Sequence, residues 1–228
     1  MVDAATFEVL QSVNLSFHAS CGSTILAGRG DRLYFGEEGR VKILDAGTGG
    51  IVGEFAVENS GPILAISPDN RYLYIAAYGT QPNIYKIDVS TDQARIVAQR
   101  SGQYGTMRLS SDGQRLYVLT PSSANFSVIE ILNADDLSFM AQIFVPRIDP
   151  NRDEVFDLFA TSSNLYVAFT LSVREASLSA AGRVVQFDAV TLRPLRNWNF
   201  VRVPAIVTSG NERYLYAFTD KARVIDLQ

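Results

Sequence analysis

His18 is the only histidine and Cys21 the only cysteine of this chain. A Ser-His-Asp or Cys-His mechanism would therefore have to use His18 as its base. His18 and Cys21 are close in the sequence, but that does not make them a catalytic dyad, so we expect a structural or incidental role for His18. The only mechanistic reason for interest in it is that histidine titrates near neutral pH. The single cysteine excludes an intrachain disulfide, and one histidine with scattered carboxylates is no zinc ligand set. We therefore predict no metal and no cofactor.

Carboxylates could serve a glycosidase, which holds two of them roughly 5 to 10 Å apart across a sugar. The candidates are Asp153, Glu154 and Asp157, which all fall in one short stretch of the chain. No other repeat offers an opposing acid on its inner strand, which argues against this class of enzyme. A second set of carboxylates, one per repeat, is expected to accept hydrogen bonds from backbone N–H groups in turns rather than to bind metal. Its members are Asp45, Asp88, Asp188 and Asp226.

Two short motifs match functional sequences only by their letters. Residues 45–53 (DAGTGGIVG) resemble a glycine-rich nucleotide loop. That loop needs a helix N-terminus after the glycines, whereas residues 51–57 have the pattern of a strand. Residues 29–31 (RGD) match a cell-adhesion tripeptide at a position where a turn is expected. Both are interpreted as hairpin turns.

The secondary-structure elements that must position these residues can be inferred from an internal sequence repeat. Five of the ten tyrosines occupy the third position of one short pattern. It reads RLYF, YLYI, RLYV, NLYV and YLYA at residues 32–35, 72–75, 115–118, 164–167 and 214–217. The spacing is about 40 to 50 residues, a period typical of repeat architectures. Turn-forming Gly, Asn, Asp, Ser and Pro precede each copy.

The first four repeats each contain four short runs rich in Val, Ile, Phe and Tyr, without a helical stripe, and the fifth contains three. Such runs predict antiparallel β-sheet and essentially no helix. In most repeats the third runs, which include Val41 with Ile43 and Ile129 with Ile131, are interpreted as apolar on both faces. Sheets that are buried on both faces must stack on one another. The sequence therefore predicts an all-β, five-bladed β-propeller with four antiparallel strands per blade.

The two ends of the chain complete this expectation. The fifth repeat stops after its third run, whereas residues 7–15 form an extra run before the first repeat. We expect the N-terminal strand, residues 6–16, to complete the blade formed by residues 204–228, which removes two open sheet edges. Residues 1–228 would then be a single propeller domain and a monomer.

The repeats resemble a known family in residues 67–76 (SPDNRYLYIA) and 111–118 (SDGQRLYV), which are similar to YVTN-type β-propeller repeats. The related propellers include lactonase-like proteins and the β-chain type of quinoprotein amine dehydrogenase, which usually have seven blades. The resemblance implies the fold, slightly favours an extracytoplasmic location, and includes both enzymes and subunits that support a catalytic partner.

Arg108 and Asp157 are the clear charged exceptions on the inner strands. Arg108 precedes Leu116 by as many residues as Asp157 precedes Leu165, so both are expected at similar positions in successive blades. A buried charge needs a partner. We therefore predict an ion pair between Arg108 and Asp157 beside the central channel.

The unusually long connections are residues 16–24, 121–125, 146–154 and 170–182, and we expect all four on one face of the propeller. Long loops on a rigid scaffold are common binding sites. The residues predicted to form a mixed-charge protein-binding surface are His18, Arg147, Asp149, Arg152, Asp153, Glu154, Arg174 and Glu175. An equally simple interpretation is that insertions are merely tolerated there.

Composition limits the remaining choices. The chain has 228 residues, 47% hydrophobic and 19% charged, with a formal net charge of −4, which is typical of a soluble globular protein. The lack of a basic excess argues against nucleic acid as a partner, and no apolar run is long enough for membrane insertion. We therefore expect a non-enzymatic binding or scaffolding module for a protein partner; the alternative is a lactonase-like or glycoside hydrolase with its site at the channel mouth.

Overall fold

The computed structural model describes residues 24–26, 31–37, 39–57, 60–77, 82–91, 93–102, 104–120, 126–146, 153–171, 182–200, 205–209, 213–218 and 222–227. These residues form strands and turns and contain no helix. The chain divides into two compact units, residues 1–102 and 103–228, which we describe separately.

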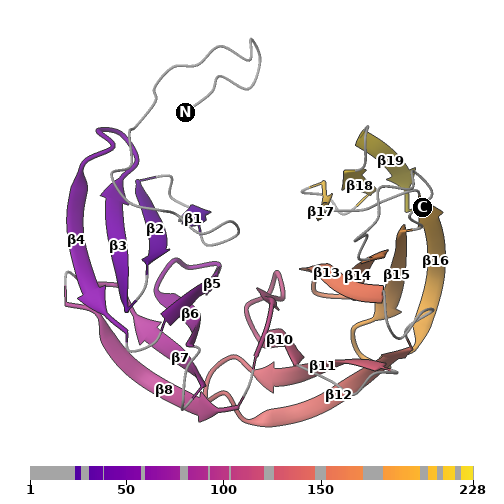
Figure 1. The fold of residues 1–228 in the computed structure, drawn as a ribbon, viewed down its shortest axis with the longest axis horizontal. Coiled ribbons are helices and arrows are strands. Elements are labelled where there is room, and N and C mark those ends of the chain that lie inside the picture. The colour runs from indigo at the N-terminus through magenta and orange to yellow at the C-terminus, as the bar shows by residue number, and fades with distance from the viewer. Residues whose placement is uncertain are drawn as a thin grey trace. The chain divides into compact units, whose positions relative to one another are not determined.

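The first unit contains two four-stranded antiparallel sheets, in which neighbours in the sequence are neighbours in the sheet (Figure 1). The strands of the first sheet are β1 (Thr24–Leu26), β2 (Arg32–Glu37), β3 (Arg40–Asp45) and β4 (Ile51–Ala56). Those of the second are β5 (Ser60–Ile66), β6 (Tyr72–Ala77), β7 (Asn83–Asp88) and β8 (Arg95–Ser101).

The second unit contains two more four-stranded sheets and one sheet of three described strands (Figure 1). The third sheet comprises β9 (Met107–Leu109), β10 (Arg115–Thr120), β11 (Phe126–Asn133) and β12 (Phe139–Pro146). The fourth comprises β13 (Asp153–Ala160), β14 (Asn164–Leu171), β15 (Gly182–Asp188) and β16 (Pro194–Phe200). The fifth comprises β17 (Ala205–Thr208), β18 (Tyr214–Phe218) and β19 (Ala222–Asp226). The all-β prediction is confirmed, and the predicted strand at residues 7–15 lies outside the described residues.

One backbone hydrogen bond recurs in all five sheets and shows that the repeat is structural. The N–H that follows the third strand donates to the carbonyl just before the second strand, at 2.8 to 2.9 Å. The five donor and acceptor pairs are Ala46 and Asp31, Val89 and Arg71, Ala134 and Gln114, Ala189 and Ser163, and Leu227 and Arg213. The tyrosine landmarks therefore occupy equivalent places on the second strands.

Apolar side chains fill the space between successive sheets within each unit. In the first unit Tyr34 of β2 packs in one cluster with Leu73 of β6. In the second, Tyr117 of β10 shares a cluster with Leu165 of β14, and Tyr166 of β14 shares one with Leu215 of β18. Each repeated tyrosine of these clusters is thus covered by the following sheet. Full burial of one such side chain stabilises the fold by about 1.5–3 kcal/mol.

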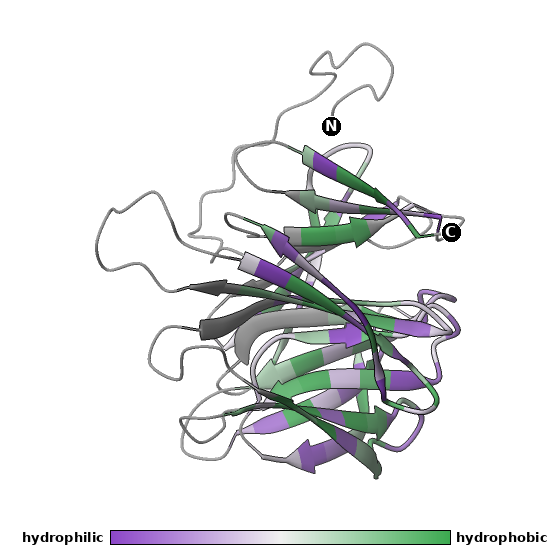
Figure 2. Ribbon diagram, turned by 90° about the vertical axis from the view of Figure 1, so that its right-hand side faces the viewer, coloured by the Kyte–Doolittle hydropathy of each residue, from purple (hydrophilic) through white to green (hydrophobic). Residues whose placement is uncertain are grey.

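In the four sheets with four described strands, the fourth strand differs from the inner strands in its exposure. Val184 and Val185 of β15 are both buried, which confirms for this third strand that both faces are apolar and covered, whereas the third strand β19 is largely exposed. Outer strands β4, β8, β12 and β16 instead carry most of the exposed large hydrophobic side chains, among them Leu195 on β16. In Figure 2 hydrophobic residues run along the strands, and hydrophilic residues are frequent near the turns.

Hydroxyl groups fix the turns between first and second strands. Ser67 Oγ accepts from the N–H of Tyr72 at 2.8 Å, and Ser110 Oγ accepts from the N–H of Arg115 at 3.0 Å. Ser67 Oγ also donates to Asp69, and this bond lowers the pKa of the Asp69 carboxyl. The serine in these turns thus takes the place of a backbone acceptor.

Aspartates at the ends of third strands fix the next turn in the same way. Asp88 accepts from both the N–H and the Oγ of Ser90, at 3.0 and 2.6 Å, and pairs with Arg71 at 3.2 Å. These bonds to Ser90 and Arg71 lower the pKa of Asp88 to about 2. The charged carboxylate is therefore the form that stabilises this turn.

The lowered pKa of Asp88 makes a prediction about acid stability. A carboxyl whose pKa is lower in the folded than in the unfolded chain, about 3.9, stabilises the fold above that unfolded value, and this contribution is lost as pH falls towards 2. We expect Asp88→Asn to be less stable than the wild type at pH 7, with the difference shrinking between about pH 4 and pH 2. Urea denaturation at a series of pH values measures this.

Asp226 provides the matched control, because it ends the equivalent strand β19 and pairs with Arg213, but its side chain is 47% exposed. Exposed pairs contribute little to stability, so Asp226→Asn should change the pH profile less than Asp88→Asn. Identical pH profiles for Asp88→Asn and the wild type would contradict the role assigned to this carboxylate.

Candidate functional site

The predicted binding surface lies mostly outside the described residues. This applies to His18, Arg147, Asp149, Arg152, Arg174 and Glu175. The backbones of Asp153 and Glu154 begin β13, opposite Leu171 and Thr170 of β14. The structure therefore describes the strand ends that hold this surface, and the surface itself stays a prediction.

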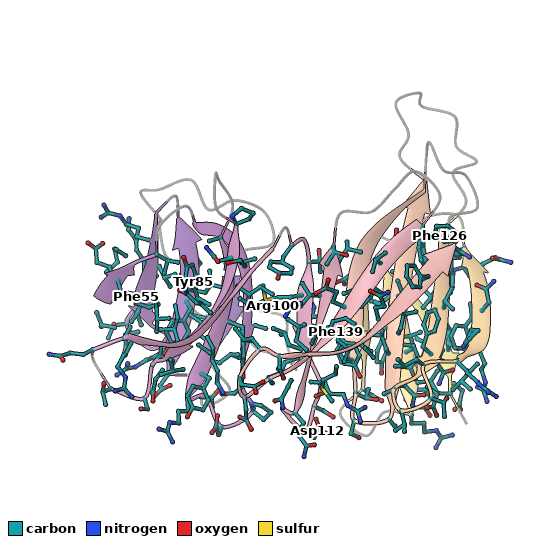
Figure 3. The ribbon with its side chains drawn as sticks, turned by 90° about the horizontal axis from the view of Figure 1, so that it is seen from below. Phe55, Tyr85, Arg100, Asp112, Phe126 and Phe139 are labelled. Carbon is teal, nitrogen blue, oxygen red and sulfur yellow. The ribbon has the colours of Figure 1, made fainter. Side chains whose placement is uncertain are left out.

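The strand registers show where the long connections of the second unit start and end. In the third sheet Phe126 pairs with Pro146, so the connections 121–125 and 147–152 leave from the same end of that sheet. In the fourth sheet Asp153 pairs with Leu171 and Thr170 with Gly182, so 147–152 and 172–181 also share an end. Figure 3 shows Phe126 at the opposite end of the third sheet from Asp112, which lies in a tight turn.

The structure brings Arg108 and Asp157 together, as the sequence predicts. Arg108 Nη2 of β9 lies 2.8 Å from Asp157 Oδ1 of β13. Their side chains are 40% and 12% exposed, respectively. The placement of this pair beside a central channel remains a prediction.

The two residues do not occupy equivalent positions, which corrects the sequence-based alignment. Arg108 pairs with Tyr117, whereas the residue opposite the equivalent Tyr166 is Phe159, not Asp157. The turn at residues 110–114 is longer than the one at residues 161–163, so equal distances along the sequence reach different strand positions. The long arginine side chain spans the resulting offset.

Asp157 connects three sheets through its carboxylate. Besides Arg108, Oδ1 accepts from the N–H of Leu158 at 2.9 Å, and Oδ2 accepts from the N–H of Ile206 at 3.2 Å. The first strands β9, β13 and β17 thus meet at one side chain. A carboxylate engaged in this way is suited to holding strands together rather than to transferring protons.

The described residues contain no group of three or more His, Cys, Asp or Glu side chains that could hold a metal ion. Asp45 and Asp188 instead accept from the N–H of Thr48 and of Thr191, both at 2.6 Å, which lowers the pKa of both carboxyls. The glycine-rich segment at residues 45–53 is the hairpin between β3 and β4, as predicted. Residues 29 and 30 of the adhesion-like tripeptide lie outside the described part.

Sequence reasoning missed a groove beside the outer strands β12 and β16 of the second unit. The only feature of the sequence that points to this groove is the presence of large apolar residues on the edge strands, such as Phe144 and Leu195. Apolar residues on strands normally predict burial, so the pattern alone did not separate a core strand from an exposed one.

Known structures with a similar fold were found at low sequence identity. Hydrazine synthase of Kuenenia stuttgartiensis is 17% identical over 92% of this chain and 58% of its own, with a TM-score of 0.63. The β-propeller domain of Cps50 (Swd1) from Myceliophteria thermophila is 15% identical over 87% of this chain and 64% of its own, with a TM-score of 0.62. The WD40 domain of Neurospora crassa Pan2 is 14% identical over 86% and 59%, with a TM-score of 0.64.

The fold is that of a β-propeller. No protein-family model matches the sequence, and the search of curated protein sequences found no match. The chain spans 58 to 64% of the length of these three structures. Membership of the YVTN family therefore stays a prediction. Within its described residues, the propeller chain has no helix of the length and apolarity needed to cross a membrane.

The Arg108–Asp157 pair makes a prediction about stability. Asp157→Ala removes the acceptor for Arg108 and for two backbone N–H groups, so we expect a loss of about 2–4 kcal/mol in the free energy of unfolding. Arg108→Ala should cost about 1–2 kcal/mol, because its side chain is partly hydrated. Urea denaturation of both single variants and the double variant gives the coupling energy, expected at about 1 kcal/mol.

Arg40 and Glu54 supply the control cycle, since their side chains are 51% and 52% exposed and their atoms lie 3.2 Å apart. Their coupling should stay below about 0.5 kcal/mol. Equal coupling energies in the two cycles would show that Asp157 holds the strands no better than a surface carboxylate does.

Proposed function

We propose that this chain is a non-enzymatic binding or scaffolding β-propeller that recognises a protein partner through its long connections. The observation that carries the proposal is the shared end of the sheets from which the connections 121–125, 147–152 and 172–181 leave. Loops gathered at one end of rigid sheets form a continuous surface that the sheets hold in place. Pan2 is one structural neighbour whose matching part is a WD40 domain, and its likeness supports the fold alone.

The charges of this surface favour a protein partner. It combines the three arginines Arg147, Arg152 and Arg174 with the acidic Asp149, Asp153, Glu154 and Glu175. A polyanion would select a surface with a basic excess, whereas a mixed surface suits charge pairing with another protein. His18, on the connection 16–24, is proposed as a further member of the same surface.

The alternative is a lactonase-like or glycoside hydrolase with its site at the channel mouth. Such an enzyme needs ligands or acids from several inner strands. Arg108 and Asp157 are charged residues on first strands, and they bond to each other. Turnover of a lactone or glycoside by the wild type, lost in Asp157→Ala, would favour the alternative.

We further propose that residues 1–228 form a closed, monomeric ring of five blades. Support comes from the fifth sheet, where Val207 and Val224 flank Tyr216 on neighbouring strands and are 37% and 59% exposed. Equivalent tyrosines Tyr117 and Tyr166 are fully buried under a following sheet. The face around Tyr216 thus carries apolar side chains of the kind that a neighbouring sheet covers in the other repeats. A strand from residues 6–16 would complete this sheet beside β19.

The loop proposal is tested by capture of partners on the immobilised chain. We expect a reproducible protein partner in extracts of the source cells, and we expect the double variant Arg152→Ala/Arg174→Ala to retain at least about fivefold less of it. The control is Arg95→Ala/Arg193→Ala, which removes two exposed arginines at the starts of outer strands and should leave retention unchanged. Equal loss in both double variants, or capture of no protein at all, would contradict the proposal.

The ring proposal is tested by removal of residues 1–16. The truncated chain should expose the edge of β19, so we expect a lower thermal midpoint and self-association on size-exclusion chromatography. A truncated chain that stays monomeric with an unchanged midpoint would contradict closure by this strand.

A further inference from the structure

A groove of about 660 Å³ lies between the outer parts of the third and fourth sheets, both in the second unit. Residues 142–145 of β12 border one side, and residues 194–197 of β16 border the other. Arg183, Val185 and Phe187 of β15 contribute to its lining. The volume lies within the range of pockets that bind ligands in proteins.

The borders of the groove are strand edges. Successive side chains of a strand point to opposite faces, so four consecutive residues can line one groove only where the backbone itself takes part. Both β12 and β16 are the outermost strands of their sheets. An edge strand can accept a further strand through its backbone groups, so the shape suits an extended polypeptide segment.

The floor of the groove is apolar. Ile143 and Val145 of β12, together with Val185 and Phe187, are at most 7% exposed. Leu195 on the rim is 52% exposed. An apolar floor with an exposed apolar rim favours an occupant with apolar side chains of its own.

The charge of the groove is positive. The Arg183 guanidinium stacks over the Phe169 ring, 4.2 Å from its centre, and none of the lining residues is acidic. Arg196 also borders the groove, but its Nη1 donates to the carbonyl of Leu227 at 3.2 Å, which directs it towards the fifth sheet. Arg183 and Arg196 are thus the two cations among the lining residues, and a carboxylate is the complement of such a charge.

The first unit contains the equivalent groove with different chemistry. It lies between β4 and residues 93–94, and its volume is about 360 Å³. Its lining includes the carboxylate of Glu54, which pairs with Arg40. Among the described residues, each unit thus has a groove beside its outer strands, and the larger one, whose lining contains no acidic residue, is in the second unit.

We propose that the groove between β12 and β16 binds an extended segment of a partner protein, with apolar side chains on its floor and an aspartate or glutamate facing Arg183. The segment adds as a further strand along one of the two edges. This docking surface is formed by the sides of two sheets, and it is argued independently of the proposed loop surface.

The test uses three fluorescein-labelled peptides with four repeats each of Leu-Glu, Leu-Lys or Ser-Glu, and fluorescence anisotropy with the full chain. We expect saturable binding of the Leu-Glu peptide and at least about fivefold weaker binding of the other two. Hydrogen exchange of the bound chain should show slower exchange of amides in residues 142–145 or 194–197. Binding of the Leu-Glu and Leu-Lys peptides with equal affinity, or no binding of Leu-Glu at millimolar concentration, would overturn the proposal.

Two variants and one control locate the site. Leu195→Asp changes an exposed side chain and should weaken Leu-Glu binding at least about fivefold without altering the thermal midpoint. Arg183→Glu should weaken binding of the Leu-Glu peptide and strengthen binding of the Leu-Lys peptide. Loss of folding cannot produce this reversal of preference. Val52→Asp, on β4 beside the smaller groove and 59% exposed, should change affinity by less than about twofold. An equal effect of Val52→Asp and Leu195→Asp would refute the location.

Discussion

Burial of the second strand on both faces is the constraint on which the remaining structure depends. The repeated leucine and tyrosine are neighbours in the sequence and so point to opposite faces of their sheet. Leu165 packs with Tyr117 of the sheet before it, whereas Tyr166 packs with Leu215 of the sheet after it. Exposure of either face would cost about 1.5–3 kcal/mol per side chain, so the fourth sheet packs against a neighbouring sheet on each face. Stacking of blades follows from this pair of residues.

Polar groups in the described structure serve this stacking. Ser67 and Asp88 close successive turns of one sheet by accepting backbone N–H groups, which keeps the strands in register. Asp157 acts between sheets, because its carboxylate reaches β9 through Arg108 and β17 through the N–H of Ile206. Buried polar groups need partners, and here the partners come from neighbouring strands. The same geometry leaves this ion pair poorly suited to catalysis, since both charges are already engaged.

The two surfaces that we propose for recognition lie outside the packed faces of the sheets. One is the end of the sheets from which the long connections leave, and the other is the side where outer strands separate. The likeness to solved β-propellers shows the fold alone, and a fold does not imply a function, so the functional argument depends on the chemistry of the site. At the sheet end that chemistry is a mixture of charges, and in the groove it is an apolar floor with Arg183.

The sequence by itself determined the period, the strand type and the turn chemistry, because these depend on side chains within a few residues of one another. The spacing of Tyr34, Tyr74, Tyr117, Tyr166 and Tyr216 was enough to predict the sheets. The sequence also predicted that Arg108 and Asp157 would meet. It did not predict that they occupy different positions along their strands, because this offset depends on how many residues the turn at 110–114 contains. Only the tertiary structure decided which apolar strands stay exposed at sheet edges. An apolar side chain such as Leu195 has the same local pattern as a core residue, and burial depends on whether another sheet covers it.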